Sequence, residues 1–268
     1  DWIDTRDPSN IKEKIKENTK LVHVESPTNP LLELCDIEST AKICKEKNVL
    51  LSVDNTFMSP YGQRPLGLGA DITMQSSTKS LSGHSDVLGG VLATNDKSLH
   101  EKLQFMLKAT GGVPSPFDNW LTLRSTKTLA LRYQKASDNA SSLANFLSEH
   151  PSVTRTIYPG LKSHPQHEIA TKQQLSPKGK VVFGAMLSID VGDIDLRDSF
   201  LKRIEVFQLA ESLGSVESLV CVPFFMTHAA LPEDIKLEMG ITKTLIRLSV
   251  GIEDLDDLKS DLSNALNK

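Results

Sequence analysis

Strand-like and helix-like segments alternate through the first 93 residues, and this alternation constrains the fold more than any other feature of the sequence. Short apolar runs occupy residues 21–24, 49–53, 70–74 and 87–93. Amphipathic helical patterns fill residues 10–18 and 36–47, and Asp36 can cap the second of them. This order predicts an α/β fold, with a mostly parallel sheet packed between helices.

The second half of the chain has a different order of predicted helices and strands. Helical patterns dominate residues 99–149, apart from a break at 111–114. Beyond residue 151, strand candidates at 181–190 and 244–250 alternate with helix candidates at 193–203 and 254–266. The sequence therefore predicts a larger domain over residues 1–145 and a smaller α/β domain over residues 146–268.

Charge and composition exclude several classes of function. The net charge of −4 and the scattered basic residues argue against a nucleic-acid partner. No apolar run approaches the roughly 20 residues that span a bilayer, so no membrane partner is expected. The three cysteines are widely spaced and no leader opens the chain, which together predict free thiols and a cytoplasmic location.

Polar residues follow three of the predicted strands, at residues 26–29, 54–56 and 76–79. Parallel strands of one sheet end at the same edge, and ligands of open α/β sheets bind there. The third group belongs to the stretch MQSSTKSLSGHSD, in which Lys79 is surrounded by hydroxyl-bearing residues. We therefore expect these groups to converge on one crevice.

The side chains at these strand ends suit one cofactor. Ser76 and Thr78 sit in a turn that can cradle a phosphate. Lys79 is a reactive amine if it is desolvated, and Asp54 is a carboxylate that can pair with a protonated ring nitrogen. Pyridoxal phosphate (PLP) requires all three. Each segment alone is more often an ordinary loop, cap or turn, so the residues by themselves leave both interpretations open.

Three other patterns are less specific. Arg247 lies inside an apolar strand, where it is either structural or a fork for a substrate carboxylate. His164 and His167 could be a pair of metal ligands, but no carboxylate or cysteine completes a zinc site, so we predict a surface loop and no metal. The stretch at residues 67–69 lacks the third glycine of a dinucleotide-binding fingerprint.

Several longer segments carry a family resemblance that extends from about residue 9 to the C-terminus. They are ESPTNP, VDNTFMSPYGQRPLGLGADI, SSTKSLSGHSD, VPSPFDNWL, YPGLKSHPQHE, AESLGSVESL and IRLSVGIEDLDDL. Together they resemble the cystathionine γ-lyase group of the Cys/Met-metabolism PLP enzymes. The resemblance implies the aspartate-aminotransferase fold (fold type I), in which a large domain with a mostly parallel sheet is followed by a smaller C-terminal α/β domain.

The resemblance also implies roles for the cofactor-binding residues. Lys79 matches the lysine that holds PLP covalently and later moves protons. Asp54 matches the carboxylate that pairs with the pyridinium nitrogen. Ser76 and Thr78 match phosphate ligands, and Asn29 matches the group near the phenolic oxygen of the ring.

A second set of matching positions concerns the substrate. Arg247 and Ser218 match residues that bind the α-carboxylate, and Glu217 matches an acidic residue near the distal part of the substrate. The reaction implied is cleavage of L-cystathionine to cysteine, 2-oxobutanoate and ammonia, with cystathionine β-lyase or γ-synthase activity as the alternatives. The assembly implied is a homotetramer built from two dimers.

The chain departs from the family pattern in two respects. Roughly the first third of the family fold, with its phosphate turn and ring-stacking tyrosine, has no counterpart here, and the chain opens without Met. We therefore expect a fragment or a truncated product, and a catalytically silent paralogue that assembles with full-length subunits remains an alternative. Ser80 also replaces the aromatic residue that usually follows the lysine.

Overall fold

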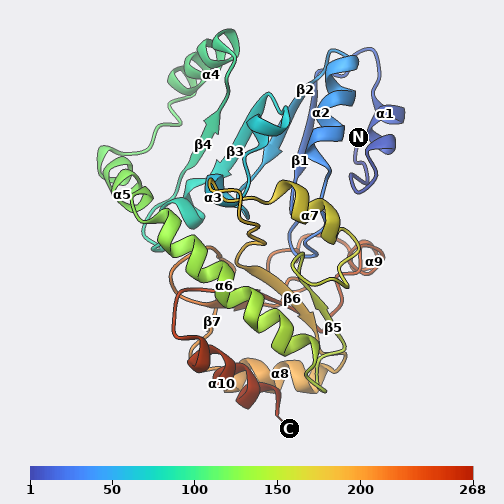
Figure 1. Cartoon of the computed structure of the whole chain (residues 1–268), viewed down its shortest axis with the longest axis vertical. Helices are drawn as coiled ribbons and strands as arrows, with labels where there is room; N and C mark the ends of the chain where they lie inside the picture. The colour runs from blue at the N-terminus through green and yellow to red at the C-terminus, as the bar shows by residue number, and fades with distance from the viewer. Residues whose placement is uncertain (268) are drawn as a thin grey trace.

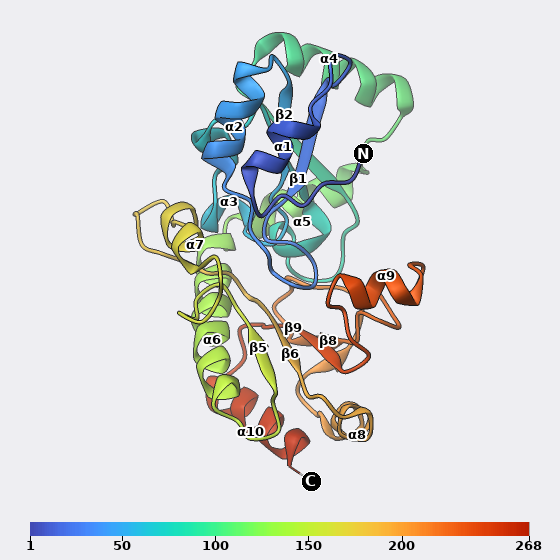
Figure 2. The ribbon, with the colours of Figure 1, turned by 90° about the vertical axis from the view of Figure 1, so that its right-hand side faces the viewer.

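Two separate β-sheets joined by one long helix make up the protein (Figures 1 and 2). The structure is a computed structural model, and it describes residues 1–267. Within that range no helix is both long and apolar enough to cross a membrane. The α/β class predicted from the sequence is confirmed.

The N-terminal sheet has four strands in the order β1-β2-β3-β4. These are β1 (Leu21–Glu25), β2 (Leu50–Asp54), β3 (Ile72–Ser76) and β4 (Gly90–Ala93). The first three are parallel, and their register places Glu25 opposite Asp54 and Asp54 opposite Met74. Their carboxyl ends therefore lie at one edge of the sheet, as the sequence predicts.

Strand β4 corrects the expectation of a further parallel strand. It starts at Gly90 rather than at residue 87, and it pairs antiparallel with β3. The connection between β3 and β4 contains one short helical turn, Ser77–Leu81, followed by a loop. It contains no helix long enough to carry the chain back along the sheet, as parallel crossovers usually do, and the chain reverses direction instead.

The helices of this half differ greatly in burial. They are α1 (Pro8–Lys14), α2 (Ile37–Glu46), α3 (Ser59–Gly62), α4 (Lys97–Thr110), α5 (Pro116–Thr126) and α6 (Leu129–Ser148). As predicted, Asp36 caps α2 by accepting a hydrogen bond from the Ser39 backbone N–H at 2.9 Å. Helices α1 and α2 pack Ile11 and Ile37 against the strands. In contrast, α4 buries none of its residues.

The C-terminal sheet has five strands in the order β5-β6-β9-β8-β7. They are β5 (Arg155–Ile157), β6 (Met186–Asp190), β7 (Gln208–Leu209), β8 (Leu219–Cys221) and β9 (Leu245–Ser249). Most neighbours are antiparallel, and only β7 and β8 are parallel. The accompanying helices are α7 (His167–Gln173), α8 (Ile194–Arg203), α9 (Glu233–Glu238) and α10 (Leu255–Leu266).

Helix α6 contributes to both halves of the molecule, as Figure 1 shows. Near its start, Leu129 and Tyr133 pack with Leu81 below the N-terminal sheet. Further along, residues such as Leu143 and Leu147 enter the core of the C-terminal sheet. The boundary predicted at residue 145 falls inside this helix, and the division into two domains stays a prediction.

Candidate active site

The polar strand ends meet at one edge of the N-terminal sheet. The Asp54 carboxylate accepts a hydrogen bond from the Thr56 backbone N–H at 2.9 Å. The Thr56 hydroxyl in turn accepts one from the Ser76 backbone N–H, also at 2.9 Å. Thr56 therefore joins the ends of β2 and β3, a role that sequence reasoning missed although the residue lies two positions after Asp54.

Lys79 occupies the helical turn Ser77–Leu81 directly after β3, and its own backbone interrupts the helical geometry. The amine is partly buried and donates a hydrogen bond to the Ser212 hydroxyl at 3.0 Å. Burial, and next the positive charge of Arg247, lower the pKa of this amine below its usual value. A lysine with a lowered pKa has a larger neutral, nucleophilic fraction at neutral pH.

A loop from the C-terminal half, residues 211–218, lies against Lys79. The Val216 backbone N–H donates to the Gly83 carbonyl at 3.0 Å. At Gly214, which has φ of +77°, an added Cβ would lie 2.9 Å from the Ser80 nitrogen and 3.3 Å from the Lys79 Cβ. Only glycine allows the two loops to approach this closely.

Arg247 on β9 reaches the same place from the C-terminal sheet. It is 2% exposed. Nη1 donates to the Asn29 side-chain oxygen at 2.9 Å, and Nη2 donates to the carbonyls of Glu211 and Ser212 at 2.7 and 3.1 Å. The structure thus brings together Asn29 and Arg247, which are 218 positions apart in the sequence.

One donor of this guanidinium is left over. Nε of Arg247 is buried and has no hydrogen-bond partner among the described residues. Buried donors in native proteins are almost always paired, and a charged donor is costly to leave unpaired. Arg247 therefore retains a free donor for an anionic group such as a carboxylate.

Glu25 is a second residue that sequence reasoning missed. It ends β1 directly opposite Asp54. Burial, followed by the negative charge of Asp54, raises the pKa of the Glu25 carboxyl to about 7. The available signal was an acidic residue closing an apolar strand, at the start of ESPTNP.

The two predicted phosphate residues stand where the sequence places them, at the start of the lysine turn. The Thr78 hydroxyl accepts a hydrogen bond from the Gly89 N–H at 2.9 Å and donates to the Gly89 carbonyl at 3.4 Å. Thr78 therefore ties the lysine turn to the segment before β4. The phosphate roles of Ser76 and Thr78 stay predictions.

Ser218 and Glu217 are neighbours in sequence but have different environments. Ser218 is fully buried, and both its backbone N–H and its hydroxyl donate to the Glu253 carboxylate, at 2.5 and 2.8 Å. Glu217 is partly exposed and accepts a hydrogen bond from the Ser85 hydroxyl. The structure brings Glu217, but not the Ser218 side chain, to the surface near the lysine turn; the substrate roles of both stay predictions.

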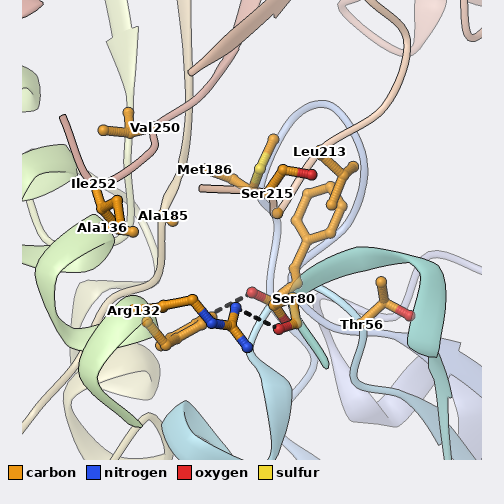
Figure 3. A pocket seen from close by; sticks show the side chains of 13 residues that line it. Thr56, Ser80, Arg132, Ala136, Ala185, Met186, Leu213, Ser215, Val250 and Ile252 are labelled. Carbon is orange, nitrogen blue, oxygen red and sulfur yellow. Dashed lines mark hydrogen bonds between the residues drawn. The ribbon is translucent and has the colours of Figure 1, made fainter. Parts of the chain in front are cut away.

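Two cavities lie near the junction of the halves. A cavity of about 20 Å³, large enough for one water, is lined by Ser80, Arg132 and Leu213 beside the lysine turn (Figure 3). A cavity of about 570 Å³ lies elsewhere, between residues 153–157 and 163–166, and none of the predicted site residues lines it. The segment that carries His164 is a loop with exposed residues at 162, 163 and 165, as predicted, but the His164 side chain itself is buried, and its Nδ1 accepts from the Gln166 N–H.

The chemistry of this residue set fits PLP. Lys79 supplies a partly desolvated amine, Asp54 supplies a carboxylate at the end of β2, and Arg247 supplies a buried cation with a free donor. Among the described residues no salt bridge engages Asp54. These are the groups that the cofactor and an amino acid require of a protein.

Comparison with known proteins identifies the family. The family model described as "Cys/Met metabolism PLP-dependent enzyme" matches residues 1–267. Cystathionine γ-lyase of Dictyostelium discoideum is 51% identical over 267 residues, which cover 100% of this chain and 68% of that protein. Cystathionine γ-lyase of Bacillus subtilis is 48% identical, and the match covers 99% of this chain and 68% of that one.

Two further relatives extend the comparison. Cystathionine β-lyase of Coxiella burnetii is 46% identical over 99% of this chain and 67% of that protein. The crystal structure of cystathionine γ-lyase from Lactobacillus plantarum, complexed with L-serine, superposes with a TM-score of 0.94 at 42% identity, over 99% of this chain and 68% of that one. The chain therefore belongs to the Cys/Met-metabolism family of PLP-dependent enzymes and is a trans-sulfuration enzyme that resembles the cystathionine γ-lyases.

Proposed function

We propose that the chain is a PLP-dependent lyase that cleaves L-cystathionine to cysteine, 2-oxobutanoate and ammonia. The observation that carries this proposal is the position of Ser212. Its hydroxyl accepts from the Lys79 amine, and its carbonyl accepts from the Arg247 guanidinium. Ser212 therefore holds a nucleophilic amine close to a cation that can bind a carboxylate. This arrangement suits an α-amino acid, because its carboxylate is attached to the carbon that reacts.

The residues that hold PLP in this proposal are Lys79, Asp54, Ser76, Thr78 and Asn29. Bound PLP supplies an electron-accepting ring next to the substrate α-carbon. Lys79 would hold the cofactor through Nζ, and its free amine would take the proton from the substrate α-carbon. Asp54 keeps the proton on the ring nitrogen, because a carboxylate beside that nitrogen favours its charged form. Asn29 stays in place through its bond with Arg247.

The substrate is bound by Arg247 and Glu217. The free Nε–H of Arg247 donates to the α-carboxylate, while the other bonds of the guanidinium fix its plane. Glu217, at the edge of the lysine turn, faces the distal part of the substrate. Ser218 contributes by holding the 211–218 loop through Glu253 rather than through a free hydroxyl.

A γ-lyase is preferred to a β-lyase because Glu217 is an acidic residue of the kind the γ-lyase resemblance implies. Sequence identity does not separate the two reactions, since the γ-lyase of Sus scrofa and the β-lyase of Coxiella burnetii are both 46% identical to this chain. We extend the proposal to a homotetramer of two dimers in the cytoplasm, in agreement with three cysteines that are all buried and free.

The test combines cofactor loading with product analysis. PLP is added to the purified chain, the absorbance of the lysine-bound cofactor is recorded, and borohydride then fixes the bond for mass spectrometry. Labelling of Lys79, loss of the band in Lys79→Ala and formation of 2-oxobutanoate with cysteine are the expected results. Pyruvate with homocysteine as the only products would instead indicate a β-lyase.

A further inference from the structure

Arg132 is a nearly buried arginine on α6 whose side chain reaches the turn that carries Lys79. It is 9% exposed. Nη1 donates to the Ser80 carbonyl at 2.9 Å, and Nη2 donates to the carbonyls of Leu81 and Ser125 at 3.3 and 2.9 Å. Figure 3 shows the guanidinium directed at Ser80. The two residues that follow Lys79 are thus held by one side chain from another element.

This guanidinium carries a charge that no carboxylate neutralises. None of the salt bridges within residues 1–267 includes Arg132, and Nε donates to the Thr128 hydroxyl at 3.1 Å. Burial alone lowers the pKa of the group. Buried charges are normally paired, so this arrangement costs free energy unless the carbonyls compensate for it.

The carbonyls it binds are the ones that a short helical turn leaves without partners. The turn Ser77–Leu81 is too short to satisfy its own last carbonyl groups, and these carry partial negative charge. Cationic side chains can bind the last carbonyls of a helix and interact favourably with their partial negative charge. Arg132 therefore supplies the hydrogen-bond donors that the last carbonyls of this turn lack.

Gly83 provides independent support, because the chain leaves room for the guanidinium there. Gly83 has φ of +68°, and an added Cβ would lie 2.0 Å from Nη1 and 2.8 Å from Cζ of Arg132. The Gly83 N–H donates to the Lys79 carbonyl at 2.7 Å. The carbonyls of three consecutive residues, Lys79 to Leu81, are consequently fixed by Gly83 and Arg132 together.

We propose that Arg132 is a positioning residue for Lys79: through the Ser80 and Leu81 carbonyls, and in the space left by Gly83, it holds the turn in the conformation that presents the Lys79 amine. This inference rests on the proposed role of Lys79 as the cofactor lysine. Arg132 acts through the backbone and touches neither cofactor nor substrate in this assignment.

The experiment compares four variants of the full 268-residue chain. Arg132→Met removes both the charge and the N–H donors of the guanidinium, whereas Arg132→Lys keeps the charge but not the planar set of donors. Gly83→Ala displaces the guanidinium. The matched control is Arg197→Met, since Arg197 is another nearly buried arginine that donates to a backbone carbonyl, that of Lys243, far from the lysine turn.

Two quantities are measured for each variant. The first is hydrogen exchange of the peptide that contains residues 79–83. The second is the rate at which PLP and borohydride label Lys79, divided by the labelling rate of the exposed Lys162, a ratio that a uniform loss of stability does not change.

In Arg132→Met and Gly83→Ala we expect faster exchange and a labelling ratio lower by about tenfold, the effect of losing one charged hydrogen bond. Arg132→Lys should recover less than half of the loss. Arg197→Met should leave both quantities unchanged.

Unchanged exchange in Arg132→Met would overturn the inference, and so would faster exchange with an unchanged labelling ratio. Failure of the unsubstituted chain to label Lys79 at all would contradict the proposed function instead. In that case slow exchange of residues 79–83 that depends on Arg132 still supports the structural part of the inference, and its absence refutes it.

Discussion

Glu25 is a residue whose ionisation opposes folding. Its pKa is about 7 in the folded chain, above the value of 4.5 for a free glutamate. As pH rises from about 4.5 to about 7, the unfolded chain loses this proton first, so stability falls over that interval and stays lower above it. At about 1.4 kcal/mol per pKa unit, the upper limit of the penalty is about 3 kcal/mol.

Glu25→Gln should therefore stabilise the chain at about pH 8 by about 1–3 kcal/mol and give little or no gain at about pH 4. The free energy of unfolding is measured by urea titration at both pH values. Glu13→Gln, at an exposed position on α1, is the control and should show no such difference. A Glu25→Gln variant that is less stable than the parent at both pH values contradicts the interpretation.

Arg247 should control the protonation of Lys79 as well as bind carboxylates. Its positive charge is one of the two causes that lower the pKa of the Lys79 amine. In Arg247→Met this repulsion is absent, so the Lys79 pKa should rise. The pH at which Lys79 becomes reactive toward an acylating reagent should move upward, whereas the exposed Arg203→Met variant should leave it unchanged. A midpoint that stays in place would show that burial alone sets this pKa.

At the level of elements, α4 and α6 contrast sharply. Helix α4 buries none of its residues, and Phe105 on it is 68% exposed. Helix α6 buries ten residues, among them Leu143 at 0% exposure. Packing of an apolar face supplies most helix stability in proteins, so α6 contributes to folding and α4 contributes little.

The contrast is testable with one substitution in each helix. Phe105→Ser should change the free energy of unfolding by no more than about 0.5 kcal/mol. Leu143→Ala should lower it by about 2–5 kcal/mol, the cost of a core cavity. Urea unfolding measures both, and a Phe105→Ser variant as destabilised as Leu143→Ala would show that α4 is packed against something in solution.

Exposed apolar residues on α4 and the neighbouring α5 also affect solubility. Phe117 and Trp120 on α5 are 64% and 56% exposed. Contiguous apolar surface promotes association. Light scattering of a Phe105→Ser/Trp120→Ser variant should therefore show smaller particles than the parent chain at the same concentration, while equal sizes would exclude this surface as the cause of association.

For the whole molecule, the sequence predicted the parts that depend on local pattern. The alternation of apolar runs located β1, β2 and β3, and Asp36 marked the start of α2. The antiparallel direction of β4 was not predictable, since it depends on a loop geometry that composition does not encode. Strand β7 has only two residues, too few for a period to be visible.

The candidate site likewise contains residues that the local sequence pattern predicts and residues that it does not. Lys79 and Asp54 were predicted because they follow strands, and strand ends of a parallel sheet converge, whereas the role of Asn29 came from the family resemblance. Ser212, Glu25 and Arg132 were missed because their roles depend on contacts between distant segments. Arg132 in particular looks like a surface residue of a polar helix until its 52-residue separation from Ser80 is closed by folding.

Helix α6 gives the molecule a constraint on chain length rather than on residue identity. Arg132 near one end must face the lysine turn, while Ala140 and Leu143 must face the C-terminal core. One inserted residue between them would rotate every later side chain by about 100° and advance it by about 1.5 Å. Substitutions at exposed positions such as Leu131 and Lys135 do not change the directions in which the later side chains of the helix point. The exposed positions of α6 can therefore diverge in composition during evolution, but insertions and deletions within the helix should be eliminated.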